Sequence, residues 1–220
     1  MNIVRSDMLA EMEFGALTLA EPYGRLLGPI ERKTGVFVWG PEGSGKSTFC
    51  LGLARALVPH ALAGGGTVLY ASREEGPDRK TRDRQRRLGA EHPALLISDF
   101  TTTENLKAAI EEYGVEFVVI DSVSALNIGT KKAEELVSWL QERETGIVCV
   151  AHANAQGRYK GQTDLPHMLD VVVKCCSPTS RPAAIWCSMR LPGSCYRIDA
   201  AGRWRCRWRR LRPVAARSAG

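Results

Sequence analysis

The sequence lacks several features that define large classes of protein. It contains no apolar run of about 18 residues, which argues against a membrane-spanning helix. Residues 1–13 have no signal-peptide core, so we expect a cytoplasmic protein without a membrane partner. No C-x-x-C pair occurs among the seven cysteines, so zinc-ligand spacing is absent and reduced, unpaired thiols are expected.

Lysine and acidic residues are nearly absent from the last forty residues. Residues 181–220 hold ten arginines, no lysine and one acid, Asp199. The other 180 residues carry 20 basic and 23 acidic side chains, so the net charge of +6 comes entirely from this tail. Trp204 and Trp208 alternate with arginines, a composition typical of single-strand binding by stacking and charge. A disordered tail of non-specific charge and a shifted reading frame in GC-rich DNA are the alternatives.

The rest of the chain alternates apolar strands with helical patterns. With 220 residues it is long enough for one sizeable core. The pattern predicts an α/β fold, with a mostly parallel, twisted sheet and helices on both faces. The expected strands are Gly35–Trp39, Thr67–Ser72, Ala94–Ser98, Glu116–Ile120 and Ile147–Ala151, with short strands from Val171 onward. The expected helices are Ser47–Val58, closed by Pro59, then Asp78–Leu88, Thr101–Tyr113 with a Thr101/Glu104 capping box, and Lys131–Glu144.

The most specific signal follows the first predicted strand. The segment fits the phosphate-loop pattern G-x-x-x-x-G-K-S/T in full, between an apolar strand and a helix. Its glycines let backbone N–H groups turn toward phosphate oxygens, Lys46 brings a cation to the β/γ-phosphates, and Ser47 is placed to bind Mg²⁺. The predicted nucleotide-binding residues are Gly40, Pro41, Glu42, Gly43, Ser44, Gly45, Lys46, Ser47 and Thr48. The sequence therefore predicts binding of a nucleoside triphosphate.

Polar residues end three further strands, at the edge where a parallel sheet builds its site. Asp121 ends an apolar strand, and its carboxylate is expected to hold Mg²⁺ together with Ser47, directly or through a bound water. Glu74 and Glu75 follow the second strand, where either carboxylate can orient the attacking water or be a solvated loop charge. His152 ends another strand, near the expected γ-phosphate.

The phosphate loop, Glu74-Glu75, Asp121 and His152, each at the end of a predicted strand and in this order, resemble the RecA-like ATPase core. The resemblance is greatest to the bacterial RadA (Sms) branch. The stretch 161–170, Gly-Gln-Thr-Asp-Leu-Pro-His-Met-Leu-Asp, is similar to the G-x-x-x-L-x-H-M-x-D motif of that branch. The resemblance implies ATP as the nucleotide, a catalytic role for Glu74, Lys46 and His152, and a ring or filament of copies. It also implies a mobile loop over Ala153–Thr163 that contacts single-stranded DNA in recombination, repair or replication, and the DNA-binding candidates there are Arg158, Lys160 and Gln162.

The chain departs from that branch in three respects. The RadA zinc module and protease-like domain are missing, which suggests a reduced core. Of the K-N-R-F-G signature only Arg190 is matched, as a possible arginine sensor, which puts DNA-stimulated turnover in question. We expect a lead-in over 1–34, a RecA-like core over 35–175, and short strands with the Arg/Trp-rich tail over 176–220.

Two other functions fit the same pattern. One is a nucleotide-gated module that loads a helicase or recombinase partner with little turnover, and the other is a DnaB-like helicase core. No guanine-reading N-K-x-D run is present, which favours ATP over GTP. The basic run Arg79–Arg87 is a further candidate for contact with a phosphate backbone, a neighbouring subunit or only solvent.

Overall fold

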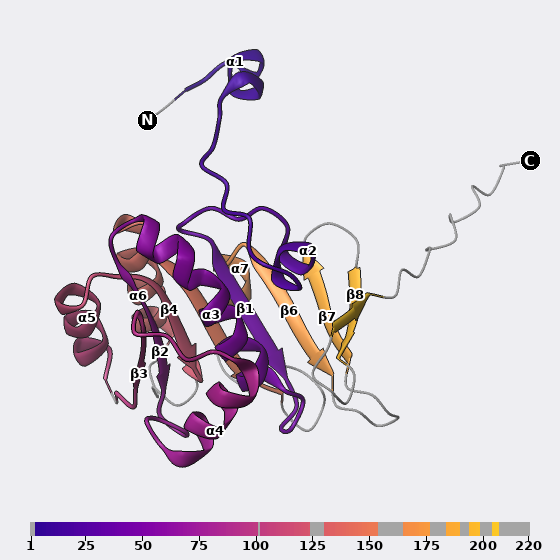
Figure 1. The fold of residues 1–220 in the computed structure, drawn as a ribbon. Coiled ribbons are helices and arrows are strands. Elements are labelled where there is room, and N and C mark those ends of the chain that lie inside the picture. The colour runs from indigo at the N-terminus through magenta and orange to yellow at the C-terminus, as the bar shows by residue number, and fades with distance from the viewer. Residues whose placement is uncertain are drawn as a thin grey trace, which may run out of the picture.

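A nine-stranded sheet forms the centre of the described part of the chain. The computed structural model describes residues 3–100, 102–123, 130–153, 165–176, 184–189, 194–198 and 204–206. The strands are β1 (Gly35–Gly40), β2 (Thr67–Ser72), β3 (Leu95–Ser98), β4 (Val115–Asp121), β5 (Gly146–His152), β6 (Val171–Cys176), β7 (Ala184–Met189), β8 (Ser194–Ile198) and β9 (Trp204–Cys206). They lie in the order β3-β2-β4-β5-β1-β6-β7-β8-β9 (Figure 1). Strands from β3 to β6 run parallel, whereas β6 to β9 pair antiparallel.

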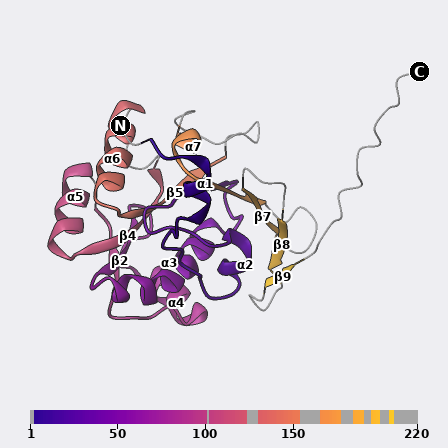
Figure 2. The same cartoon turned by 90° about the horizontal axis from the view of Figure 1, so that it is seen from above.

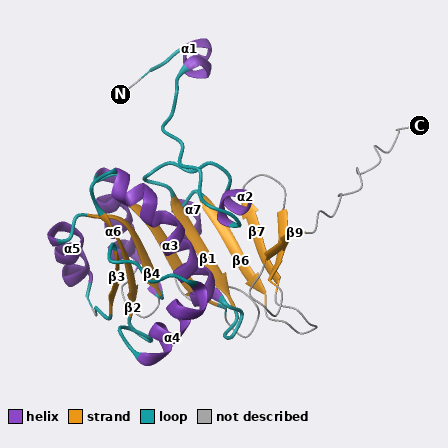
Figure 3. Cartoon of the chain, viewed as in Figure 1, coloured by secondary structure: helices purple, strands orange, loops and turns teal. Residues whose placement is uncertain are grey.

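Helices cover both faces of the parallel part. They are α1 (Ser6–Glu11), α2 (Tyr23–Leu27), α3 (Lys46–Ala63), α4 (Arg79–Leu88), α5 (Thr103–Glu112), α6 (Thr130–Glu142) and α7 (Leu165–Met168). Figure 2 shows α2, α3 and α4 on one side of the sheet and α5, α6 and α7 on the other, and Figure 3 marks the same layers by type of structure. The predicted α/β architecture, with a mostly parallel sheet covered on both faces, is confirmed.

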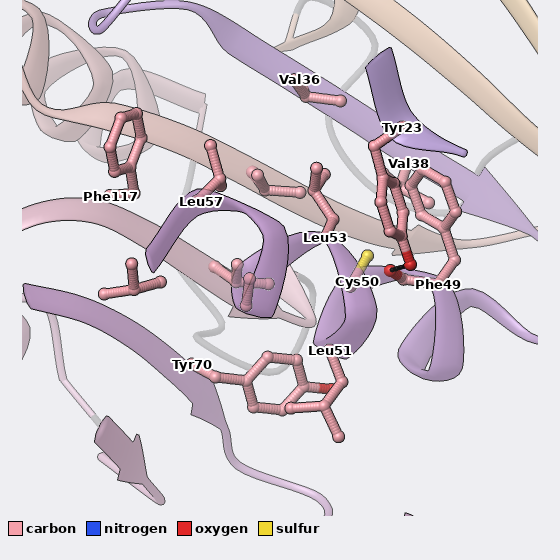
Figure 4. Close-up of a cluster of buried hydrophobic side chains, with 14 of the residues drawn as sticks. Tyr23, Val36, Val38, Phe49, Cys50, Leu51, Leu53, Leu57, Tyr70 and Phe117 are labelled. Carbon is pink, nitrogen blue, oxygen red and sulfur yellow. Dashed lines mark hydrogen bonds between the residues drawn. The ribbon is translucent and has the colours of Figure 1, made fainter. Parts of the chain in front are cut away.

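Alternating strand residues supply two separate cores. Val36 and Val38 of β1 face α3, where they pack in one cluster with Phe49, Leu53 and Tyr70 (Figure 4). Phe37, between them in sequence, faces the other way and packs in a cluster with side chains of α5 and α6. Because both faces are buried, the strands read as continuous apolar runs rather than as an alternating pattern.

Helix α3 passes through Pro59, so the predicted end at Val58 is wrong. Pro59 has no N–H to donate to the helix, yet the helix continues to Ala63. The side chains of Val58 and Ala61 are fully buried, and their packing favours the extra turn. The N–H of Gly64 then bonds to the carbonyls of His60 and Ala61, which ends the helix.

The N-terminal cap of α5 lies one residue later than predicted. The hydroxyl of Thr102 accepts a 3.2 Å hydrogen bond from the N–H of Asn105, so Thr102 is the cap. Thr101 is outside the described residues. Glu104 is therefore in the second helical position, where its carboxylate accepts a bond from the Thr103 hydroxyl instead of closing a capping box.

Part of the N-terminal lead-in packs onto the core, and further strands extend the sheet after residue 171. Leu19, Tyr23 and Leu27 of the lead-in are buried against the α3 face, and the Tyr23 hydroxyl donates to the carbonyl of Phe49 at 3.3 Å (Figure 4). Helix α1 stands apart from the body and has no buried residue (Figure 1). The short strands expected after Val171 are present as β6 to β9.

Candidate functional site

The phosphate loop connects β1 to α3 at the carboxyl edge of the sheet. Gly43 and Gly45 have φ values of 70° and 88°, in the left-handed region that favours glycine. Gly40 is required for a different reason, since a Cβ there would lie 2.1 Å from the carbonyl oxygen of Cys175 in β6. Helix α3 begins at Lys46 without a side-chain cap, so its first N–H groups are directed to the loop.

Lys46 is held inside this loop. Its ammonium donates to the carbonyls of Gly40 at 3.0 Å and Pro41 at 2.8 Å, and only 5% of the residue is exposed. Burial lowers the pKa of Lys46, although nearby Asp121 and Glu42 oppose that shift. The hydroxyl of Ser44 is also buried and has no hydrogen-bond partner among the described residues. The loop thus carries a cation and an unused donor at the position where phosphate is expected.

The phosphate loop and the predicted residues at the ends of β2, β4 and β5 lie side by side, because β2, β4, β5 and β1 are neighbours in the sheet. Ser72, at the end of β2, pairs in register with Asp121 of β4, and Gly40 pairs with His152 of β5. β5 therefore separates the phosphate-loop strand from the strand that carries Asp121. This order places His152, at the end of β5, between the end of the strand that leads into the phosphate loop and the end of the strand that carries Asp121.

Asp121 is oriented by a residue that the sequence analysis missed. The Tyr70 hydroxyl donates a 2.7 Å hydrogen bond to Oδ2 of Asp121, and both side chains are buried. Burial, followed by the charge of Asp121, raises the pKa of Tyr70 well above its ordinary value, so the phenol stays protonated and remains a donor. A phenol within the otherwise apolar run Val68–Ala71 was the signal available in the sequence.

Glu74 and His152 face each other across the site. Oε1 of Glu74 lies 3.6 Å from Nε2 of His152, which is too long for a hydrogen bond. The Nε2 atom is buried and without a hydrogen-bond partner among the described residues, whereas 59% of the Glu74 side chain is exposed. An unpaired buried nitrogen and a solvent-accessible carboxylate are therefore adjacent.

Glu75 is engaged elsewhere. Its carboxylate accepts two bonds from the guanidinium of Arg84, one of them 2.9 Å long from Nη2 to Oε1. This ion pair is only partly exposed, with side-chain fractions of 25% for Glu75 and 16% for Arg84. The two acids that the sequence left as alternatives thus differ sharply in their surroundings. Nothing in the sequence spacing indicated that Arg84 would form an ion pair with Glu75.

The donor set fits a magnesium ion in the form that nucleotide sites use. Mg²⁺ is usually held by one or two protein oxygens, with phosphates and water completing its shell. The Asp121 carboxylate, fixed by Tyr70, and the Ser47 hydroxyl at the start of α3 match that requirement. Within the described segments, no group of three or more His, Cys, Asp or Glu residues forms a separate metal cage.

Four predicted site residues lie outside the described residues. These are Arg158, Lys160 and Gln162 of the expected DNA-contacting loop, and Arg190 of the expected sensor. Among the described helices, none is long and apolar enough to cross a membrane. A cavity of about 610 Å³ lies at the opposite, amino edge of the sheet, beside the Arg32–Glu116 ion pair, and is separate from the phosphate loop.

Comparison with known proteins agrees with this geometry. Residues 11–153 match the family AAA_25, described as an AAA domain. The chain is 29% identical over 164 residues to DNA repair protein RadA of Treponema pallidum (strain Nichols), which covers 69% of this chain and 34% of that protein. It is 30% identical over 164 residues to RadA of Bacillus subtilis (strain 168), covering 69% and 35%. The matched segment thus spans about a third of these relatives.

Solved structures share the fold at low identity. The KaiC-like protein of Pyrococcus horikoshii OT3 superposes with a TM-score of 0.62 at 16% identity, covering 89% of this chain and 100% of that one. Flagellar accessory protein FlaH of Methanocaldococcus jannaschii gives a TM-score of 0.63 at 15% identity, covering 90% and 100%. The chain therefore belongs to the AAA domain family AAA_25, and its core is a RecA-like P-loop ATPase fold.

Proposed function

We propose that this protein hydrolyses ATP with Mg²⁺ and uses the nucleotide state to control its grip on single-stranded DNA. The observation that supports hydrolysis is the contrast between the two acids. Glu75 is bound to Arg84, whereas the Glu74 carboxylate is exposed and 3.6 Å from the unpaired Nε2 of His152. A carboxylate that keeps contact with water is the one suited to orient the attacking water.

Each of the other predicted site residues at this edge has a role in this proposal. Lys46 and the N–H groups at the start of α3 bind the phosphates and stabilise charge as the γ-phosphoryl group is transferred. Ser47 and Asp121 would hold Mg²⁺, which would supply neutralisation of the phosphate charge. Nε2 of His152 contacts the γ-phosphate, and because His152 is the last residue of β5, that contact moves the segment that follows it.

The proposed DNA contact rests on resemblance and on surface charge. The relatives are DNA repair proteins by name, which suggests a role in repair or recombination. Helix α4 lies at the carboxyl edge of the sheet (Figure 1) and pairs with Glu75 through Arg84. It exposes Arg79, Arg82 and Arg86 by 85%, 51% and 61% of their side chains. Asp83 and Glu91 neutralise part of that charge, which leaves an excess of positive charge for a phosphate backbone.

Assembly is the third part of the proposal. Sites in the RecA-like fold commonly lie between subunits, so a ring or filament is expected, in which Arg190 of one copy completes the site of another. Size-exclusion chromatography with light scattering, with and without ATP, measures this directly. A particle that stays monomeric under both conditions would contradict assembly without affecting ATP binding.

The deciding experiment is ATP hydrolysis measured with Mg²⁺ alone, with single-stranded DNA, and with duplex DNA of the same sequence. The proposal predicts hydrolysis that single strands stimulate more than duplex does. Glu74→Gln, purified identically, is the control for contaminating ATPases. Turnover that is unchanged by either DNA would contradict the coupling and favour a nucleotide-gated loader, while a failure to bind ATP would contradict the proposal as a whole.

A further inference from the structure

Every polar group of Glu75 is held by a neighbour. Its N–H donates to the Ser72 hydroxyl at 3.2 Å, and its carbonyl accepts from the Thr81 hydroxyl at 3.0 Å. Its carboxylate accepts two bonds from Arg84. Ser72 is the last residue of β2, and Thr81 and Arg84 belong to α4. Glu75 therefore ties the end of a buried strand to a helix.

The contacts of α4 come from one face. Thr81 and Arg84 are three residues apart, so they lie one above the other on the helix. Thr81 is buried, and its N–H bonds to the carboxylate of the cap residue Asp78 at 2.8 Å, which fixes the start of the helix. The side facing Glu75 is therefore held by hydrogen bonds, while the side with Arg79 and Arg82 faces solvent.

Arg84 differs from the other arginines whose ion pairs are known on this helix. Its side chain is 16% exposed, against 51% or more for Arg79, Arg82 and Arg86. The hydrogen bonds to Glu75, partly offset by burial, raise the pKa of Arg84, so the guanidinium is charged at every working pH. A forked pair that is partly withdrawn from water is more restrictive than a surface ion pair, because its geometry is fixed by two bonds.

We infer that Arg84 is a positioning residue for the proposed reaction: it fixes Glu75 and thereby holds the preceding residue, Glu74, opposite His152. It also keeps the Glu75 carboxylate away from the attacking water, so only one of the two acids serves it. This inference rests on the proposed hydrolysis by Glu74 and deepens it. Arg84 does not touch the nucleotide, so its effect on turnover passes through Glu74.

The test is a set of variants assayed for turnover and for binding separately. Arg84→Gln is expected to lower kcat by about 10- to 100-fold, the effect of a displacement near 1 Å at the reacting group, with the affinity for a fluorescent ATP analogue unchanged within about twofold. Arg84→Lys keeps the charge but loses the fork, so it is expected to restore part of kcat. Arg143→Gln, which removes a more exposed arginine–glutamate ion pair with Glu111 at the opposite, amino edge of the sheet, is the matched control and is expected to behave as wild type.

Two further variants separate positioning from general damage to the fold. In a Glu74→Gln background, Arg84→Gln is expected to lower the residual turnover no further, because the group that it positions is already disabled. Glu75→Gln removes the same ion pair from the other side and is expected to reproduce the loss in kcat. It therefore replaces Arg84→Gln as the test if that variant does not fold. Circular dichroism and thermal unfolding identify a variant that fails to fold.

The outcomes that overturn the inference are distinct from those that overturn the function. Wild-type kcat in both Arg84→Gln and Glu75→Gln, with hydrolysis intact, would overturn the positioning role alone. An equal fractional loss from Arg84→Gln in the presence and absence of Glu74 would do the same. Absence of hydrolysis in the wild-type protein would overturn the proposed function, and the inference with it.

Discussion

The hydroxyl of Tyr70 in β2 donates a 2.7 Å hydrogen bond to Oδ2 of Asp121 at the end of the neighbouring strand β4. Both side chains are buried. The carboxylate therefore has a fixed orientation before any metal or nucleotide binds. A metal-binding carboxylate with a fixed orientation loses less freedom on binding than a mobile one, which relates this contact to magnesium affinity.

Tyr70→Phe is expected to weaken magnesium use while leaving the fold intact. The variant removes one bond to a charged acceptor and leaves a buried oxygen unpaired, so we expect a loss of about 1–3 kcal/mol in the free energy of unfolding. The magnesium concentration for half-maximal ATPase should rise. Tyr113→Phe, at an exposed position, is the matched control. An unchanged magnesium requirement in Tyr70→Phe would contradict the role given to this hydrogen bond.

Lys46→Ala is expected to abolish nucleotide binding or turnover. The variant removes the cation that the loop carbonyls of Gly40 and Pro41 hold in place, and with it the charge that attracts the phosphates. Isothermal titration with an ATP analogue measures the loss, and Lys80→Ala on α4 is the control at an exposed lysine. ATP affinity within twofold of wild type would contradict the assignment of the phosphate loop.

ATP affinity is also expected to depend on pH through Lys46. Burial lowers the pKa of this ammonium, and only the charged form attracts phosphate. The affinity for ATP is therefore highest at pH values below the lowered pKa. It falls as pH rises through that pKa, which happens at a lower pH than for an ordinary lysine. Lys46→Arg stays charged throughout and should show a flatter profile, even if it binds more weakly. Identical profiles in the alkaline range would contradict this account.

Gly40→Ala and Gly43→Ala are expected to differ because the two glycines are needed for different reasons. A methyl group at Gly40 would approach the Cys175 carbonyl to 2.1 Å, so β1 and β6 must separate, at a cost of about 1–3 kcal/mol or more. Gly43 has open space around it, and only its φ of 70° opposes alanine, which costs about 1 kcal/mol. Urea unfolding measures both, and a larger loss for Gly43→Ala would contradict the packing argument.

The strands and the phosphate loop were predictable because local sequence determines them. The predicted strands 67–72 and 116–120 coincide with β2 and the interior of β4, and the loop pattern specifies its own turn. The end of α3 was not predictable, because buried contacts of Val58 and Ala61 outweigh the local effect of Pro59. The cap of α5 was ambiguous among three consecutive threonines, and only the fold selects Thr102.

The candidate site was predictable as residue types but not as contacts. Strand ends indicated Asp121, Glu74 and His152, since parallel strands bring their carboxyl ends together. The residue pattern left Glu74 and Glu75 open, and only the family resemblance favoured Glu74. The surroundings that distinguish the two acids depend on where α4 lies relative to β2, which no spacing in the sequence specifies. The Arg84–Glu75 ion pair and the Tyr70–Asp121 hydrogen bond are contacts between separate elements, so they become visible only in the folded chain.

We propose that Glu74, rather than Glu75, orients the attacking water. The most direct test of this proposal compares single-turnover ATP hydrolysis by wild type, Glu74→Gln and Glu75→Gln, with ATP binding measured on the same preparations. We expect Glu74→Gln to bind ATP as wild type does but to stall, whereas Glu75→Gln is impaired less and retains measurable hydrolysis. Hydrolysis by Glu74→Gln at the wild-type rate would contradict it.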